Sequence, residues 1–136
     1  MDLNIIKIAA DTKNNQLLDI YDLKIKQKNS ICGDKIEISL EIKKNKIYKI
    51  GFECNSCIYS QASAALLSNF SINKTLSEIN ELRLFLENYF KNRESMFPKK
   101  WKIFKKLINK KNISRKECLM LPFNAIYKIS KINKYE

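Results

Sequence analysis

Residues 36–52 read IEISLEIKKNKIYKIGF, and this stretch decides the fold. From position 36 to position 42, Ile or Leu stands at every second residue, and Glu or Ser stands between them. A period of two predicts a half-buried strand. Lys44-Asn45 predicts a turn, and the apolar-rich run from Ile47 to Phe52 predicts a strand that folds back on the first.

The residues before this stretch predict one more strand. Tyr21, Leu23 and Ile25 alternate with charged residues, so the three runs together predict an antiparallel meander. A sheet of three strands with one wet face needs helices on its other face. Further upstream, the apolar residues within positions 2–12 predict a short amphipathic helix.

After the sheet, the hydrophobic period becomes helical. Small residues follow Cys57 at helical spacing, and small residues let a helix pack close to a sheet. Thr75 or Ser77 can cap the next helix, and the last helix is expected near Ser114, where Ser114-x-x-Glu117 has the capping-box spacing. We therefore expect four helices after the sheet. The first starts at residue 57, the second spans 77–91, the third spans 99–111, and the last starts near residue 114.

These elements predict an α+β fold: a three-stranded antiparallel sheet with helices packed mainly on one face. The chain has 136 residues, of which 45% are hydrophobic, and this suits one domain with its own core. Neither an internal repeat nor a linker is visible in the sequence. We therefore expect a single domain over residues 1–136.

The charge of the chain admits two interpretations. The net charge is +12, which favours an anionic partner or an acidic protein surface. The 26 basic residues, however, include only Arg83, Arg93 and Arg115 as arginines, and phosphate and base readers favour arginine. The abundance of Lys, Ile and Asn also fits the drift of an AT-rich genome. A basic helix at 99–111 that docks on an acidic protein stays open beside a merely solvated face.

The start of the sequence shows no signal peptide, because it is acidic at Asp2 and has no long apolar segment. A run of about 18 apolar residues, as a membrane span needs, is also missing. We therefore expect a cytoplasmic protein with no membrane partner.

Four cysteines in a reducing compartment are more typical of ligands or nucleophiles than of disulfides. The sequence contains no His, which excludes most general-base schemes.

Three of the cysteines stand at positions that suit metal or sulfur chemistry. Cys32 is followed by Gly33 and Asp34 in the loop between the first two strands. Cys57 and Cys118 stand at the expected N-termini of helices, where the positive end of the helix dipole favours thiolate. Three thiolates and one carboxylate suit Zn²⁺ or a [2Fe–2S] cluster. Scattered cysteines are also common as small buried hydrophobes, so position alone leaves both interpretations open.

Three segments of the chain resemble one known family. They are SICGDKIEISL at 30–40, FECNSCIYSQASA at 52–64 and RKECLMLPFNAI at 115–126. In this order they are similar to the three cysteine motifs of the IscU/NifU N-terminal-domain family of iron–sulfur cluster assembly scaffold proteins. The long spacing between the second and third cysteines, and Arg115 before the third, resemble its SufU-like branch.

The resemblance implies a site and a function. Cys32, Asp34, Cys57 and Cys118 would ligate zinc, iron or a transient [2Fe–2S] cluster, and Cys32 would accept persulfide sulfur. The protein would be a scaffold that receives sulfur from a SufS-type cysteine desulfurase and passes a cluster to a downstream scaffold or apo-protein acceptor. The alternative is an enzyme, a zinc-dependent sulfurtransferase that carries persulfide from the desulfurase to a downstream scaffold. A basic RNA- or protein-binding module with a structural zinc is a third hypothesis, although nucleic acid is not the expected partner.

The chain departs from the family pattern near the second and third cysteines. Glu117 stands where the Isc branch has His, and that branch's chaperone-docking segment is missing, so an Hsp70 partner is not implied. Cys54 and Ser56 replace glycines before Cys57, and this puts a fourth thiol beside the expected site. Cys54, Arg115 and Glu117 are therefore candidate auxiliary residues, with Cys54 either a ligand or sulfur relay or a bystander.

Overall fold

The computed structural model describes residues 3–29, 31, 33–92 and 94–133. Within these ranges it contains three strands, four α-helices and two 3₁₀ helices. In chain order they are α1 (Leu3–Ala9), β1 (Leu23–Lys28), β2 (Lys35–Lys43), β3 (Lys46–Asn55), α2 (Ile58–Ser71), α3 (Leu76–Lys91), η1 (Lys99–Lys106), η2 (Lys110–Arg115) and α4 (Lys116–Asn133).

The alternating stretch forms the expected sheet. Strand β2 lies in the middle and pairs antiparallel with both β1 and β3. Its alternate residues Ile36, Ile38 and Leu40 are at most 2% exposed, because they face the helices. The first strand begins later than expected, at Leu23, and Tyr21 remains 45% exposed before it.

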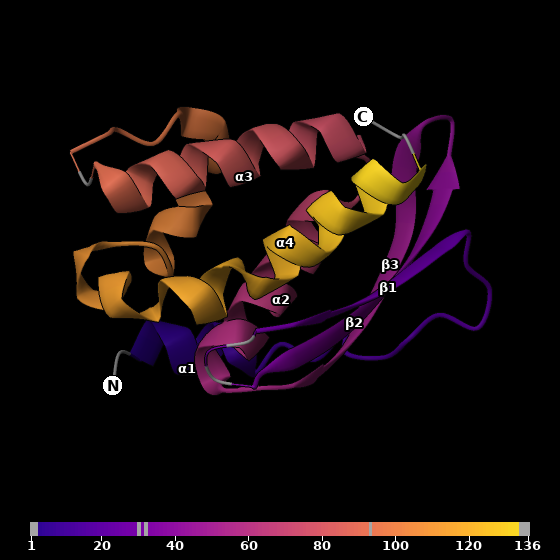
Figure 1. Ribbon diagram of the computed structural model, residues 1–136, viewed down its shortest axis with the longest axis horizontal. Coiled ribbons are helices and arrows are strands. Elements are labelled where there is room, and N and C mark those ends of the chain that lie inside the picture. Colours follow the sequence, from indigo (N-terminus) through magenta and orange to yellow (C-terminus); the bar gives the residue numbers. More distant parts are fainter. Residues whose placement is uncertain (1–2, 30, 32, 93, 134–136) are drawn as a thin grey trace.

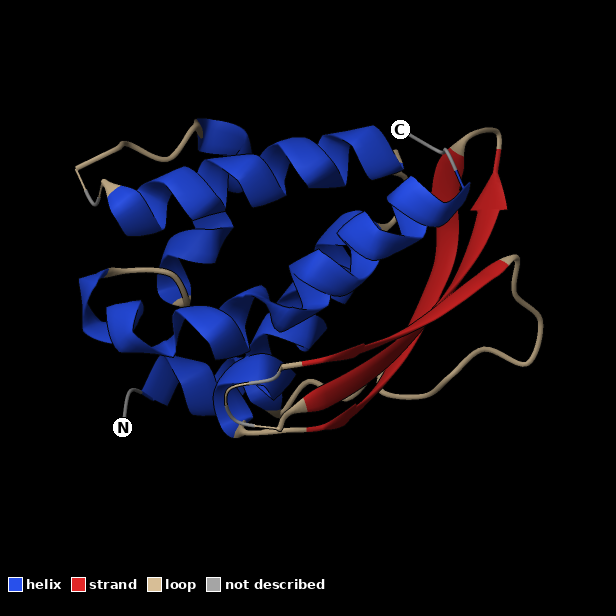
Figure 2. Ribbon diagram, in the orientation of Figure 1, coloured by secondary structure: helices blue, strands red, loops and turns tan. Residues whose placement is uncertain are grey.

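The helices cover one face of the sheet, as Figures 1 and 2 show. Helices α2 and α4 pack directly on the strands, and α3 packs on the far side of α4. The expected α+β class, with helices mainly on one face, is confirmed. Hydrophobic side chains at or below 1% exposure fill the space between sheet and helices, among them Leu67, Leu119 and Phe123.

The connection from α1 to β1 crosses the other face of the sheet (Figure 1). Two small residues that pair across β2 and β3, Ser39 and Gly51, make room for it. The Ser39 hydroxyl accepts the backbone N–H of Leu18 at 2.9 Å, and the Phe52 N–H donates to the Asn14 carbonyl at 3.0 Å. The connection is therefore bonded to both strands.

The expectation of one basic helix over 99–111 is wrong. The structure has two 3₁₀ helices there, η1 and η2. The buried residues Trp101, Phe104 and Leu107 recur at a spacing of three, which matches the three residues per turn of a 3₁₀ helix. The expectation that Trp101 belongs to the core is confirmed, since it is 8% exposed.

The starts of the last two α-helices agree with the sequence to within about two residues. The Thr75 side chain accepts the N–H of Glu78 at 3.0 Å and completes a capping box at the start of α3. Helix α4 starts at Lys116, slightly after the expected Ser114, which lies in η2. Within the described ranges, no helix is both long and apolar enough to cross a membrane.

Candidate metal centre

Three chain segments bring candidate ligands to one end of the sheet. Asp34 immediately precedes β2, Cys57 is the N-cap of α2, and Cys118 lies in the first turn of α4. One carboxylate oxygen of Asp34 and the two sulfur atoms all lie within 4.8 Å of one another. Asp34 is 9% exposed and Cys118 is 8% exposed, so the group lies just beneath the surface.

The Cys57 sulfur sits where α2 offers unpaired backbone N–H groups, whereas Cys118 lies in the first turn of α4, which continues directly from η2. Cys57 has extended N-cap geometry, with φ −70° and ψ 168°, and its side chain makes no capping bond. The first N–H groups of an α-helix have no partner within the helix, and they favour negative charge nearby. The arrangement therefore places the Cys57 sulfur at the positive end of the α2 dipole.

Ser60 joins the three ligand segments. Its hydroxyl lies 3.1 Å from Oδ2 of Asp34 and 2.8 Å from the backbone carbonyl of Cys118, and the Cys57 sulfur lies 3.9 Å from it. Ser60 is fully buried, at 0% exposure. The side chain is therefore a polar link between β2, α2 and α4 at the centre of the group.

Pro122 explains why Ser60 is needed at this position. In an α-helix the carbonyl of Cys118 would accept the N–H of residue 122, but proline has none. The sequence places Pro122 near the start of the helix, and the structure has it inside α4, in the second turn. The Ser60 hydroxyl donates to this carbonyl instead. The proline therefore leaves the Cys118 carbonyl able to accept a hydrogen bond from α2.

Replacing Ser60 by alanine is expected to cost about 2–3 kcal/mol of stability, because the buried Cys118 carbonyl loses the hydrogen bond that Ser60 donates. It is also expected to weaken zinc binding about 10-fold through loss of support for Asp34. Ser63→Ala is the matched control. Ser63 donates to the Leu119 carbonyl at 2.6 Å, but the residue four positions on, Phe123, carries an N–H. Urea unfolding and zinc titration should show a smaller stability loss and unchanged zinc affinity for Ser63→Ala.

The loop that carries the remaining proposed ligand is only partly described. Cys32 lies outside the described residues. Next to it, Gly33 has φ +76°, a left-handed conformation that favours glycine, and its N–H donates to the Asn29 carbonyl at 2.8 Å. The expected role of Cys32 as ligand and persulfide acceptor therefore stays a prediction.

Cys54 does not belong to the group of three. It pairs across the sheet with Ile36 and packs half-buried against the core. Burial raises the pKa of its thiol to about 11, although a hydrogen bond with Ser56 acts in the opposite direction. The thiol therefore stays protonated at neutral pH, and its role as auxiliary ligand or relay stays a prediction.

The raised pKa of Cys54 predicts slow alkylation of the folded protein. A thiol whose pKa rises from 9.0 to about 11 carries about 100-fold less thiolate at neutral pH. We expect iodoacetamide to modify Cys54 about 100-fold more slowly in the folded chain than in urea at pH 7.5. The rate in the folded chain should keep rising with pH up to about 11. Peptide mass spectrometry measures both rates, and equal rates in the two states would contradict the burial of this thiol.

The other two candidate auxiliary residues lie beside the group. The guanidinium carbon of Arg115 lies 4.9 Å from the centre of the Tyr59 ring, which is a cation–π contact between the end of η2 and the start of α2. Glu117 is exposed in the first turn of α4. Neither residue is in the group that could hold a metal, and their roles stay predictions.

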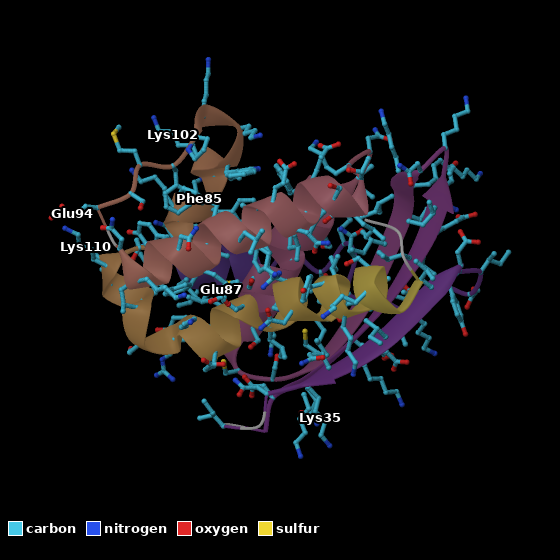
Figure 3. The ribbon with its side chains drawn as sticks, turned by 45° about the horizontal axis from the view of Figure 1, so that its top comes forward. Lys35, Phe85, Glu87, Glu94, Lys102 and Lys110 are labelled. Carbon is cyan, nitrogen blue, oxygen red and sulfur yellow. The ribbon has the colours of Figure 1, made fainter. Side chains whose placement is uncertain are left out.

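A cavity of about 1090 Å³ lies elsewhere, between the end of α3 and the two 3₁₀ helices. Figure 3 shows Glu94, Lys102 and Lys110 around this end of the molecule, far from Lys35, which follows Asp34. The basic residues that line the cavity are Lys99, Lys102, Lys105, Lys106, Lys110 and Lys111. The cavity is therefore separate from the candidate metal centre.

Two residues that sequence reasoning left without a role belong to the surroundings of the site. Ser60 stands three residues after Cys57, a spacing that puts both side chains on one helix face. Asn29 is 6% exposed at the end of β1, and its backbone N–H donates to the Asp34 carbonyl at 2.7 Å. In the sequence, Asn29 is recognisable as a polar residue that continues the alternation of β1 on the side that faces the helices.

The fold and this group define the class: an α+β protein in which two thiols and a carboxylate could hold a metal ion. The chain belongs to the family of NifU-like N-terminal domains, whose family model matches residues 4–91. That match includes Asp34 and Cys57 and ends before Cys118. No curated protein matches the sequence.

Solved structures match nearly the whole chain. The N-terminal part of a nitrogen-fixing NifU-like protein from Brucella abortus has a TM-score of 0.83 at 17% identity, covering 94% of this chain and 90% of that one. A putative iron–sulfur cluster assembly scaffold protein for the SUF system from Fervidobacterium islandicum has a TM-score of 0.76 at 21% identity, covering 93% of both chains. The structure of a hypothetical protein also has a TM-score of 0.76 at 21% identity, covering 96% of this chain and 99% of that one. These likenesses confirm the fold.

Proposed function

We propose that this protein is an iron–sulfur cluster assembly scaffold that works in the cytoplasm. It binds iron or zinc, holds a transient [2Fe–2S] cluster as its cargo and accepts sulfur from a cysteine desulfurase of the SufS type. A downstream scaffold or an apo-protein then receives the cluster. Membership of the NifU-like family and the fold shared with a putative SUF scaffold support this proposal.

One observation carries the proposal. Two sulfurs and one carboxylate oxygen, from segments distant in the sequence, meet within 4.8 Å just beneath the surface. Thiolates are the ligands that zinc and iron–sulfur clusters prefer, and a carboxylate is a harder ligand that exchanges more readily at a thiolate site. A donor set of this kind suits cargo that must be released.

In this proposal each residue has a distinct part. Cys57 and Cys118 are fixed thiolate ligands at helix N-termini. Asp34 is the exchangeable ligand, and Cys32 completes the set and takes sulfur from the desulfurase. Sulfur transfer forms a persulfide on the Cys32 sulfur as the desulfurase's own persulfide S–S bond breaks and its thiolate leaves.

The compactness of the group favours a second candidate function, the zinc-dependent sulfurtransferase. Zn–S bonds of about 2.3 Å place the corners of a tetrahedron about 3.8 Å apart. The three ligand atoms, all within 4.8 Å of one another, are close to that spacing. A [2Fe–2S] cluster instead divides its four ligands between two irons, so this group would have to open to accept it.

Elemental analysis of protein isolated without air tests the two candidates first. Reconstitution with iron and sulfide should then give visible absorption if the protein is a scaffold. Tight stoichiometric zinc, together with stimulation of a desulfurase that is lost in Cys32→Ala, would instead support the sulfurtransferase. Unchanged metal content in the alanine variants of Cys32, Cys57 and Cys118 would reject both. Salt-sensitive RNA binding with no desulfurase response would support a basic binding module.

Replacing Asp34 by alanine is expected to make the protein hold a reconstituted cluster several-fold longer. The reason is that the substitution removes the hard oxygen ligand from a thiolate site. Visible absorption followed after addition of an iron chelator measures the lifetime. Glu53→Ala is the control, because it removes an exposed carboxylate from β3. A shorter lifetime in Asp34→Ala than in the unmodified chain would contradict the exchangeable role of Asp34.

A further inference from the structure

Asn29 lies beside the candidate metal centre. Its backbone N–H donates to the Asp34 carbonyl at 2.7 Å, which extends the pairing of β1 and β2 by one step beyond Lys28 and Lys35. Asn29 is 6% exposed and Asp34 is 9% exposed, whereas the two lysines before and after them are exposed. The two side chains are therefore cross-strand neighbours on the helix-covered face, with Cβ atoms about 5 Å apart.

The side-chain amide of Asn29 has a hydrogen-bond partner for its oxygen, but its nitrogen has none among the described residues. Its oxygen accepts the backbone N–H of Ile31 at 2.9 Å, which forms a turn in the loop before Gly33. Its nitrogen, Nδ2, is buried and has no hydrogen-bond partner in the described part of the chain. Buried amide nitrogens are nearly always paired, so one that has no partner among the described residues and lies next to a ligand group points to a bound ligand as its partner.

The position of this nitrogen limits what the partner can be. The turn bond to Ile31 holds the carboxamide in the loop between β1 and β2, beside Asp34. The Asp34 carboxylate in turn lies within 4.8 Å of both the Cys57 and Cys118 sulfurs. Anything that these three residues bind together therefore lies beside Asp34, the cross-strand neighbour of Asn29. An N–H group requires an acceptor, and beside the Asp34 carboxylate the acceptors that an iron–sulfur or persulfide site offers are anionic sulfurs.

We propose that Asn29 contacts the cargo directly, by donating an N–H···S hydrogen bond from its side-chain amide to sulfur bound at this centre. The inference rests on the proposed function. Hydrogen bonds to cluster sulfur stabilise the negative charge that the sulfur carries, and they are one of the means by which proteins tune such sites. An amide donates without adding charge, so it stabilises the bound sulfur and leaves the ligand set anionic.

Two substitutions separate this role from a purely structural one. Asn29→Ser keeps a short side-chain oxygen for the turn bond to Ile31 and loses the amide N–H. Asn29→Asp keeps an acceptor of the same shape as the native one, loses the N–H and adds a negative charge. A direct bond to anionic sulfur predicts that Asp is the more damaging change. A role limited to the turn predicts that Asp is the milder one.

The experiment reconstitutes the full chain with iron and sulfide and follows visible absorption after addition of a chelator. We expect Asn29→Ser to lose the cluster about 10-fold faster than the unmodified chain, and Asn29→Asp to lose it faster still. Asn80→Ser is the matched control. Asn80 also has a buried side-chain atom without a partner, but its amide bonds Ser130 at the other end of α4 from Cys118. Its cluster lifetime should stay within about twofold of the unmodified chain.

A lifetime within about twofold of the unmodified chain in Asn29→Ser, or a milder effect of Asp than of Ser, would overturn the role of Asn29 and leave the scaffold proposal intact. If the unmodified chain forms no cluster, the scaffold proposal fails before any variant is compared, and the inference about Asn29 fails with it. Circular dichroism of each variant shows whether the fold is kept.

Discussion

Replacing Cys57 or Cys118 by alanine is expected to weaken zinc binding on the order of 100-fold or more and to abolish the colour of a reconstituted cluster. Each substitution removes one of the two sulfurs that stand within 4.8 Å of the Asp34 carboxylate. The remaining atoms can no longer form a thiolate-rich tetrahedron. Competition with a chromophoric chelator measures the zinc affinity, and visible absorption after anaerobic reconstitution measures cluster formation.

Cys54→Ala is the matched control for these variants. Cys54 is close to Cys57 in sequence but packs against the core outside the ligand group. Its replacement should leave zinc affinity within about threefold of the unmodified chain. Cys118 is itself 8% exposed, so Cys118→Ala can also lower stability, and thermal unfolding of the metal-free variants accounts for that effect. Full zinc stoichiometry at unchanged affinity in either Cys57→Ala or Cys118→Ala would contradict the proposed centre.

The sheet could be predicted because apolar and polar residues alternate from Ile36 to Ile42 in its central strand. Ile36, Ile38 and Leu40 mark the helix-covered face of β2, while Ser39 on the other face is buried by the connection from α1. The 3₁₀ segment could not be assigned in the same way. Trp101, Phe104 and Ile108 have the spacing of an α-helix with 3.6 residues per turn. Trp101, Phe104 and Leu107 fit a 3₁₀ helix with three residues per turn nearly as well, and the structure follows this second pattern.

The candidate site was predictable in its residue types and only partly in its arrangement. The family motifs pointed to Asp34, Cys57 and Cys118, and the structure places their ligand atoms together. The supporting contacts depend on how distant segments pack. Ser60 meets the Cys118 carbonyl only because α2 lies against α4, and Asn29 meets Asp34 only through the register of β1 on β2. No local sequence pattern encodes such contacts.

The two glycines of the chain illustrate the same contrast. Gly33 is required by its own backbone, which has φ +76°, while nothing lies within 4 Å of where a Cβ would be. Gly51 has no such conformation. A Cβ there would collide with the backbone carbonyl oxygen of Gln16, in the connection that crosses the outer face of the sheet. The first requirement is local, and the second depends on a segment about 35 residues away.

Replacing Gly51 by alanine is therefore expected to destabilise the protein by about 3 kcal/mol and to lower its melting temperature by roughly 10 °C. Backbone atoms cannot move aside by changing a rotamer, so the connection must lift and lose the bond from the Leu18 N–H to Ser39 and the bond from the Phe52 N–H to Asn14. Gly33→Ala is the comparison, with a cost of about 1–2 kcal/mol from strain alone. Urea unfolding measures both. A loss at Gly51 no larger than the loss at Gly33 would show that the connection does not pack on the sheet as described, and hydrogen exchange of the Leu18 and Phe52 amides would locate the disagreement.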